Sequence, residues 1–302
     1  MSQRTLTSAV VALLVSTLSL SWAARAGACA PCGSGDSTLT STGTEQPFLG
    51  RLRSAAELRY RTDAIGRPGI DRMRIRELRA DVSTAWAVRD DLFLLASLPL
   101  LYRDVTETNL ARSQIRSLGD VELGAKWFVW RDRSFAPRWL VAVLGGVKLP
   151  TAPWREDTPG RPLPLEVQPG SGSLDLSFGA SLAFFGDALS TYVSLQQREP
   201  IVSRSQLEPG RSLHASAALQ YQLGELLAAR GSCELRLDQS SREAGARDAN
   251  SGGMIAYVGA ELLLSPFEDF SIVSGVHLPA LQRLRGAHDE GLISSLALIR
   301  DW

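Results

Sequence analysis

Hydrophobic and polar residues alternate clearly between residues 119 and 150. Alternation with a period of two predicts a β-strand, because successive side chains of a strand point to opposite faces. Residues 139–149 alternate as well, and the charged stretch 131–137 between the two segments predicts a turn. We therefore expect a hairpin. Its first strand carries Val121, Leu123, Ala125, Trp127 and Val129 on one face and Asp120, Glu122, Gly124 and Lys126 on the other.

The same alternation recurs from Arg51 to the end of the chain and predicts an all-β protein of about twelve strands. A soluble sandwich explains the alternation, but it does not explain charged residues along an inner face. Arg51, Arg53, Arg59 and Arg61 share one face of the first strand, where they cannot contact lipid. A transmembrane β-barrel places apolar residues toward lipid and polar residues toward the lumen. We therefore predict an antiparallel transmembrane β-barrel of the outer-membrane type.

Connection lengths support this prediction, because short and long connections alternate. Such alternation is typical of periplasmic turns and extracellular loops, and it predicts that both termini are periplasmic. Several aromatic residues then fall at the periplasmic interface, where amphipathic rings are favoured: Trp86, Trp127, Trp139, Phe184 and Phe270. The short turns are 89–91, 131–137, 186–187, 223–225 and 265–269, and the long loops are 62–69, 103–113, 151–171, 198–211, 239–252 and 279–290.

The charge composition does not favour nucleic acid as a partner, because the 302 residues include 32 basic and 32 acidic side chains. Outer-membrane lipids and a small solute are the expected partners, and no cofactor is expected. The chain contains no apolar run of the roughly 20 residues that a spanning helix needs.

The N-terminus predicts export. Arg4, an apolar segment at 9–20 and the triplet Ala26-Gly27-Ala28 together indicate a signal peptide over residues 1–28. Residues 29–50 form a Ser/Thr/Gly-rich periplasmic leader, and residues 51–302 form the barrel. The leader opens with Cys29 and Cys32, whose spacing suits a disulfide, a metal site or a redox pair. Lipidation of Cys29 is a rival interpretation, although Ala26 stands where such signals carry Leu.

Three segments resemble a known family when they are taken together. They are Gly119 to Lys126 (GDVELGAK), Gly146 to Thr151 (GVKLPT) and Gly275 to Gln282 (GVHLPALQ). In this order they resemble the outer-membrane transporters named for the meta-cleavage pathway of phenol degradation, over most of the chain after Gly50. The resemblance implies a barrel that passes small, often aromatic compounds. The final Trp302 also resembles the C-terminal signal by which the barrel-assembly machinery recognises outer-membrane proteins.

The predicted lumen face carries the candidate solute pathway. Its charges either orient a polar or anionic solute or compensate one another in the wall of a closed, narrow barrel. The triplets Ser97-Leu98-Pro99, Lys148-Leu149-Pro150 and His277-Leu278-Pro279 predict strand ends at a shared extracellular rim. Either Ser97, Lys148 and His277 line one constriction there, or the triplets only terminate their strands. The candidate pathway residues are Arg53, Arg59, Arg79, Asp120, Glu122, Lys126, Lys148 and His277.

The predicted function is passive passage of a small solute, aromatic or anionic, across the outer membrane. The alternatives are a closed structural barrel and a barrel whose Cys29/Cys32 leader binds metal or a redox partner. A lipid hydrolase is a minor alternative, because His214-Ala215-Ser216 matches the spacing of outer-membrane phospholipases. That pair shares parity with Gln220 and therefore faces the lumen, so no enzymatic activity is predicted. Cys233 shares parity with Leu227, Leu235 and Leu237 on its own strand and is expected to face lipid.

Overall fold

The computed structural model describes residues 49–67, 69–107, 109, 111–134, 136–158, 161–203 and 207–302. The predicted signal peptide and most of the leader, with Cys29 and Cys32, lie outside the described residues.

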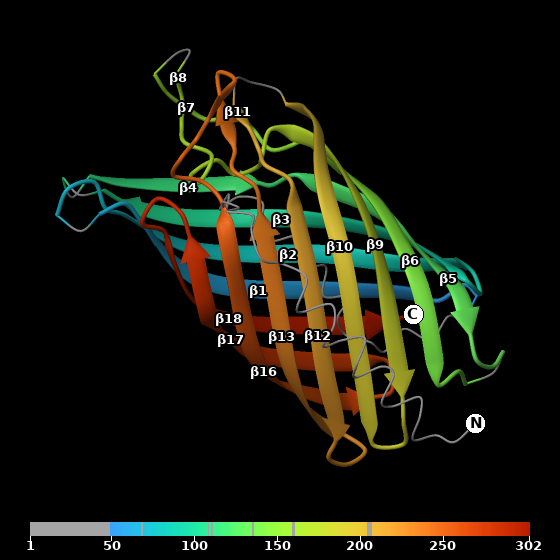
Figure 1. Cartoon of the computed structure of the whole chain (residues 1–302). Coiled ribbons are helices and arrows are strands. Elements are labelled where there is room, and N and C mark those ends of the chain that lie inside the picture. Colours follow the sequence, from blue (N-terminus) through green and yellow to red (C-terminus); the bar gives the residue numbers. More distant parts are fainter. Residues whose placement is uncertain are drawn as a thin grey trace.

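Twelve strands of the described chain form one closed antiparallel barrel, as predicted (Figure 1). Each strand pairs with its neighbours in the chain, and pairing of the first with the last closes the ring, with Arg53 opposite Asp301. In ring order the strands are β1 (Leu52–Ile65), β2 (Met73–Arg89), β3 (Leu92–Thr106), β5 (Val121–Arg131), β6 (Trp139–Leu149), β9 (Ser173–Phe185), β10 (Leu189–Ser203), β12 (Ser212–Gln222), β13 (Leu227–Asp238), β16 (Gly253–Phe267), β17 (Phe270–Leu284) and β18 (Asp289–Asp301). A further strand, β4 (Arg112–Leu118), precedes β5 and pairs with the upper half of β3.

The two faces of the strands differ as the alternation predicts. In a single-layer barrel a buried side chain must point inward, and an exposed apolar side chain must point outward. Val82 is 50% exposed on the outer face of β2, whereas Glu77 is 2% exposed on its inner face. Cys233 is exposed on the outer face of β13. None of the described residues forms a helix that is long and apolar enough to cross a membrane.

Several strands extend further than the sequence predicted. Residues 103–106, 198–203 and 279–284 were expected in loops but belong to β3, β10 and β17. The expectation that Pro99 and Pro279 end their strands is therefore wrong. Pro99 lies where the partner of β3 changes from β5 to β4, and Pro279 lies at a register shift against β16. Proline lacks an N–H, so a break in the ladder is the place where a strand tolerates it.

The ends of the barrel differ in their connections. Short turns join the strands at one end, which also holds the start of β1 and the end of β18. The outward-facing aromatic residues predicted for one interface, Trp86, Trp127, Trp139, Phe184 and Phe270, lie near this end. Trp139 and Phe184 are in contact, with 4.6 Å between ring centroids. A bulge after Phe128 turns Trp130 outward as well.

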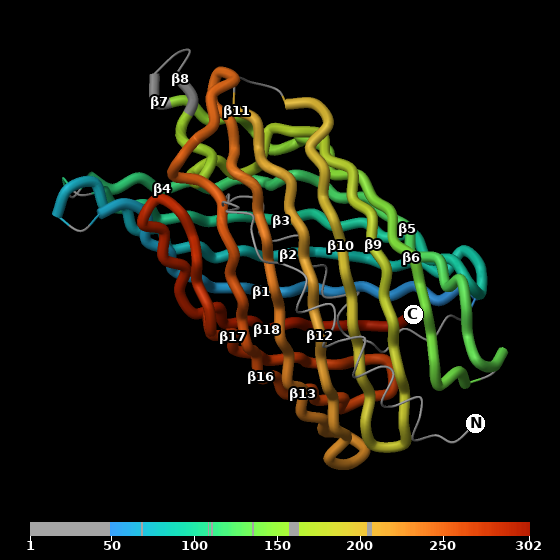
Figure 2. Tube along the Cα trace, viewed as in Figure 1, coloured from blue at the N-terminus to red at the C-terminus, as the bar shows by residue number. Residues whose placement is uncertain are grey.

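The long connections at the other end contain short strands that the sequence did not predict (Figure 2). β11 (Leu207–Glu208), β14 (Arg242–Glu243) and β15 (Ala246–Arg247) form a small three-stranded sheet. β7 (Glu156–Thr158) and β8 (Arg161–Pro162) form a hairpin in the connection between β6 and β9.

That connection also sends residues 163–171 inward, and we call this segment the inward loop. Val167 packs against Ile75, Val105 and Ile115, on the inner faces of β2, β3 and β4. Gln168 is fully buried, and its amide group bonds to backbone atoms of Arg155 and Leu163. The inward loop therefore fills part of the lumen at the end with the long connections.

At the short-turn end the lumen is filled by apolar side chains. Phe93 and Phe128 meet edge to face, with ring centroids 5.7 Å apart. Leu140, Leu263 and Ile299 pack in the same cluster. We call this cluster the apolar layer, and it narrows the lumen at the short-turn end.

Candidate functional site in the barrel lumen

Long charged side chains cover the inner face of β1 and β2, which we call the arginine wall. Arg61 Nε lies 3.0 Å from Glu77 Oε1, and Arg103 of β3 contacts the same carboxylate. Arg59 Nη2 lies 2.9 Å from Glu57 Oε2. Because each buried charge has an opposite charge beside it, the wall stays inside the barrel without a net desolvated charge.

Two further ion pairs belong to the arginine wall. Arg79 Nε lies 2.7 Å from Asp81 Oδ2, and Arg53 Nε lies 2.7 Å from Asp301 Oδ1 on β18. These pairs place Arg53, Arg59 and Arg79 on the inner face. Their part in a solute pathway stays a prediction.

Small side chains occupy the middle of the inner face of β9, β10 and β12, and we call this region the serine wall. Ser181, Ser194 and Ser216 are cross-strand neighbours in one row. Ser194 Oγ and Ser216 Oγ are hydrogen-bonded at 2.7 Å. Ala183 and Ala218 lie in the next row, on either side of Tyr192. The alternation along the chain did not predict this wall, although Ser194, Gln196, His214 and Ser216 show its period-two pattern.

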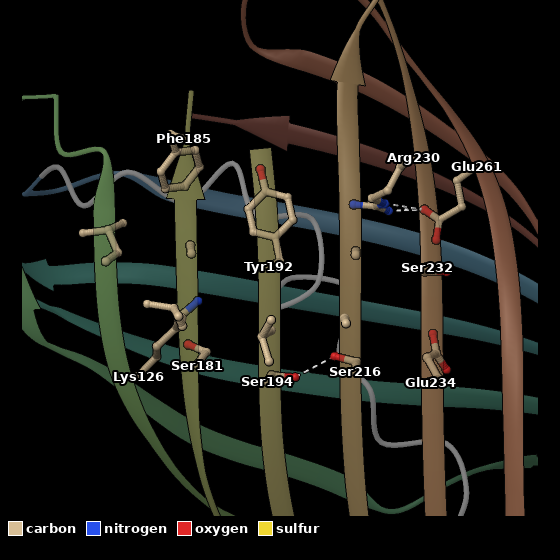
Figure 3. Close-up of a pocket in the computed structure, with 16 residues that line it drawn as sticks. Lys126, Ser181, Phe185, Tyr192, Ser194, Ser216, Arg230, Ser232, Glu234 and Glu261 are labelled. Carbon is tan, nitrogen blue, oxygen red and sulfur yellow. Dashed lines mark hydrogen bonds and ion pairs between the residues drawn. The ribbon is translucent and has the colours of Figure 1, made fainter. Parts of the chain in front are cut away.

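The two walls face each other across the lumen, because β1 and β2 stand six places from β10 and β12 in the ring of twelve. Two cavities lie against the serine wall. One, of about 40 Å³, is lined by Lys126, Phe185, Tyr192, Ser232 and the serine row (Figure 3). The other, of about 70 Å³, lies between the serine row and Arg59 and Arg61. Ser194, Ser216 and Glu234 line both, so the cavities adjoin.

Their size limits what they can hold. A cavity of about 10 to 15 Å³ holds one water, whereas a cavity that accepts benzene has a volume of about 150 Å³. The cavities therefore hold several waters, and an aromatic ring needs the side chains around them to move.

Three of the predicted residues lie on β5 or just before it. Asp120 accepts hydrogen bonds from the backbone N–H groups of Ser171 and Ala152, at 2.8 and 3.1 Å, so its carboxylate anchors the inward loop. Glu122 pairs with Arg198 of β10 at 2.9 Å. The Lys126 ammonium lies 5.2 Å from the centre of the Phe128 ring, at the edge of the apolar layer.

The predicted rim residues do not share one ion cluster. Lys148 pairs with Asp175 of β9. His277 lies between Glu261 and Glu234, with N–O distances of 3.6 and 3.8 Å. Gly259 lies against the imidazole ring, because a Cβ there would fall 2.5 Å from His277 Nδ1. The role of Lys148, His277 and Ser97 as one constriction stays a prediction.

The His214 and Ser216 pair does not show the geometry of a nucleophile beside its base. The Ser216 hydroxyl is bonded to Ser194, while His214 lies one row further along, between Gln196 and Arg236. No group of three or more potential ligands could hold a metal ion within the described part of the chain.

The fold and the lumen define a β-barrel of the outer-membrane type. The chain matches no protein-family model and no curated protein sequence. Among solved structures it is similar to an outer membrane channel from Pseudomonas putida F1, with 11% identity and a TM-score of 0.66 over 84% of this chain and 96% of that chain. This likeness supports the barrel fold, whereas the predicted relation to the phenol-pathway family stays a prediction.

Weaker likenesses are also found. The translocator domain of the autotransporter NalP from Neisseria meningitidis shows 10% identity and a TM-score of 0.49 over 87% of this chain and 92% of that chain. The toluene transporter TbuX from Ralstonia pickettii shows 10% identity and a TM-score of 0.45 over 92% of this chain and 95% of that chain.

Proposed function

We propose that this protein is a narrow outer-membrane channel whose solute moves along the serine wall. The observation that carries the proposal is the pair of adjoining cavities between two unlike walls. Small side chains on β9, β10 and β12 leave the space, and in the larger cavity Arg59 and Arg61 of the arginine wall hold its far side. A barrel that served only as a structural element would need no such adjoining cavities.

The lining suits a small aromatic compound that carries a polar group. Phe185 and Tyr192, whose ring centroids are 5.8 Å apart, offer apolar contact. Serine hydroxyls accept and donate hydrogen bonds, and the lining carries two cations, Lys126 and Arg230, against two carboxylates, Glu234 and Glu261, so it favours a polar substituent without selecting its charge. Since the cavities are smaller than a benzene ring requires, passage of such a solute needs movement of Arg59 and Arg61.

The proposed orientation has both termini and the short turns in the periplasm, with the long connections outside. Trp302 is exposed at the end of β18, and its backbone N–H donates to Leu52 O at 2.8 Å. A C-terminal aromatic at the seam between the first and last strands suits recognition by the barrel-assembly machinery. The Cys29/Cys32 leader, as a disulfide, metal or redox element, would act on the periplasmic side.

A closed structural barrel is the second candidate, and the apolar layer favours it. Phe93, Phe128 and Leu140 pack at the short-turn end of the lumen, where a channel must open. The two candidates differ in a measurable property, because only a channel conducts ions.

Planar-bilayer conductance of wild type and of Ser216→Trp tests the proposal. The indole ring would fill the cavities, so we expect wild type to conduct and the variant to lose most of its conductance. Leu219→Trp is the matched control, because Leu219 is 51% exposed on the outer face of the same strand. Absence of wild-type conductance, or full conductance of Ser216→Trp, would favour the closed barrel.

A further inference from the structure

The largest of the hollows described here lies outside the lumen, at the end with the long connections. Its volume is about 570 Å³, against about 40 and 70 Å³ for the lumen cavities. It lies between the upper ends of β10, β12 and β13 and the small sheet of β11, β14 and β15. Arg211, Arg242, Arg247, Glu199 and Glu208 supply its charged lining.

Strand parity shows that this hollow opens on the outer surface. Arg198 and Ser212 are buried inside the barrel, so their neighbours Glu199 and Arg211 point outward. Arg211 Nε lies 2.6 Å from Glu199 Oε1. Below this pair on β10 the outward residues are the polar Gln197 and then Leu195 and Val193, which are apolar and 50% and 38% exposed. The hollow therefore begins where the apolar band of the barrel ends, at the depth of lipid headgroups.

Two arginines of the hollow oppose each other. Arg242 and Arg247 are cross-strand partners in the β14–β15 hairpin, and both are exposed. Like charges directly opposite each other destabilise a strand pair. Within the described part of the chain neither arginine forms an ion pair, and the one carboxylate in their row is Glu208, opposite Arg242. A bound anion between the two guanidinium groups would remove the repulsion.

A third arginine borders the same place. Arg285, at the end of β17, donates from Nη1 to Ser240 Oγ at 3.0 Å, and Ser240 lines the hollow. Guanidinium groups bind phosphate oxygens through two parallel hydrogen bonds, so such a cluster suits a phosphate better than a neutral sugar. The volume is large enough for a sugar phosphate.

We propose that this hollow binds the phosphorylated sugar headgroup of an outer-leaflet glycolipid, with Arg242 and Arg247 on the phosphate. The inference rests on the proposed outer-membrane location and orientation, and it does not depend on the lumen conducting. The headgroup is favoured over a free anion because the hollow borders the lipid-facing band. A bound headgroup would also hold the loops of β11, β14 and β15 against the barrel.

The test measures binding of bisphosphorylated lipid A to the purified full-length protein by native mass spectrometry. Arg242→Ser/Arg247→Ser should raise the dissociation constant roughly tenfold or more, since each lost charge-assisted contact contributes about a factor of ten. Arg89→Ser/Arg133→Ser is the matched control, because both of its arginines are exposed at the short-turn end. It should leave the dissociation constant within about twofold.

Three results would overturn the proposal. They are an unchanged dissociation constant in Arg242→Ser/Arg247→Ser, an equal loss in the control, and equal affinity of wild type for dephosphorylated lipid A. Inorganic phosphate that bound as tightly as lipid A would reassign the hollow to a free anion. Planar-bilayer conductance of the same variants should equal that of wild type, so failure of this proposal and failure of the channel proposal give different results.

Discussion

The arginine wall and the serine wall lie on opposite sides of the same lumen, but their side chains differ in size and charge. On β1 and β2, long side chains fill the lumen and neutralise one another, as in the contact between Arg61 and Glu77. On β10 and β12, Ser194 and Ser216 leave space and carry no charge. A barrel interior can thus be fixed on one side and open on the other. The difference separates stability, which we assign to the arginine wall, from passage, which we assign to the serine wall.

The largest expected effect is on the arginine wall. Glu77 is 2% exposed and contacts both Arg61 and Arg103, so Glu77→Gln removes a buried carboxylate from two cations, although Arg61 keeps its contact with Asp63 at 3.5 Å. We expect the free energy of unfolding to fall by about 3 to 5 kcal/mol. Urea unfolding of the vesicle-reconstituted protein, followed by tryptophan fluorescence, measures it. Glu225→Gln, in an exposed turn, is the control and should change stability by less than about 0.5 kcal/mol.

The next effect concerns the inward loop, which shares the lumen with both walls. Asp120→Ala removes the acceptor for the N–H groups of Ala152 and Ser171. The free energy of unfolding should fall by about 1 to 3 kcal/mol, because two buried donors lose their partner. Single-channel conductance should rise as the loop loosens. Asp187→Ala, in an exposed turn, should change neither quantity, and an unchanged conductance in Asp120→Ala would show that the inward loop does not narrow the path.

A smaller effect is expected on the serine wall. Ser194→Ala/Ser216→Ala removes both partners of one hydrogen bond, so the free energy of unfolding should change by about 1 kcal/mol or less. The same urea experiment measures it. A loss as large as that of Glu77→Gln would mean that the serine wall is structural, and the contrast between the walls would fail.

The smallest effect lies outside both walls, in the turn between β5 and β6. Hydrogen bonds from the backbone N–H groups of Trp139 and Arg138 hold the pKa of Asp132 below its usual value. A lowered folded-state pKa stabilises the fold above the unfolded pKa of about 4, and this stabilisation is lost as pH falls further. Asp132→Asn should therefore reduce the loss of stability between about pH 5 and pH 3. An unchanged pH dependence of urea unfolding would show that the turn does not contribute.

The alternation of apolar and polar residues predicted the barrel and its twelve strands because one face of each strand contacts lipid. It also placed Arg53, Glu122 and Lys148 inside, since parity decides the side of the sheet. It did not predict which residues meet across the lumen. Glu122 pairs with Arg198, 76 residues away, and that contact depends on barrel curvature.

The prediction that two strands end at proline residues was wrong for a related reason. Pro99 and Pro279 suggested strand ends, but partner changes and bulges in neighbouring strands accommodate them. The serine wall was overlooked because small residues give a weak local signal. Their importance emerges only when β9, β10 and β12 stand side by side, opposite the arginines.

Thiol modification during conductance recording tests the central claim, that the solute path follows the serine wall. Cysteine is placed at Ser216 in a background in which Cys29, Cys32 and Cys233 are replaced, and a charged, water-soluble thiosulfonate is added to one open channel. We expect the current to fall by at least about half on modification of Ser216→Cys, because the added group enters the space between the walls. Leu219→Cys, on the outer face of β12, should show no change. An undiminished current through Ser216→Cys, with modification verified by mass spectrometry, would contradict the account.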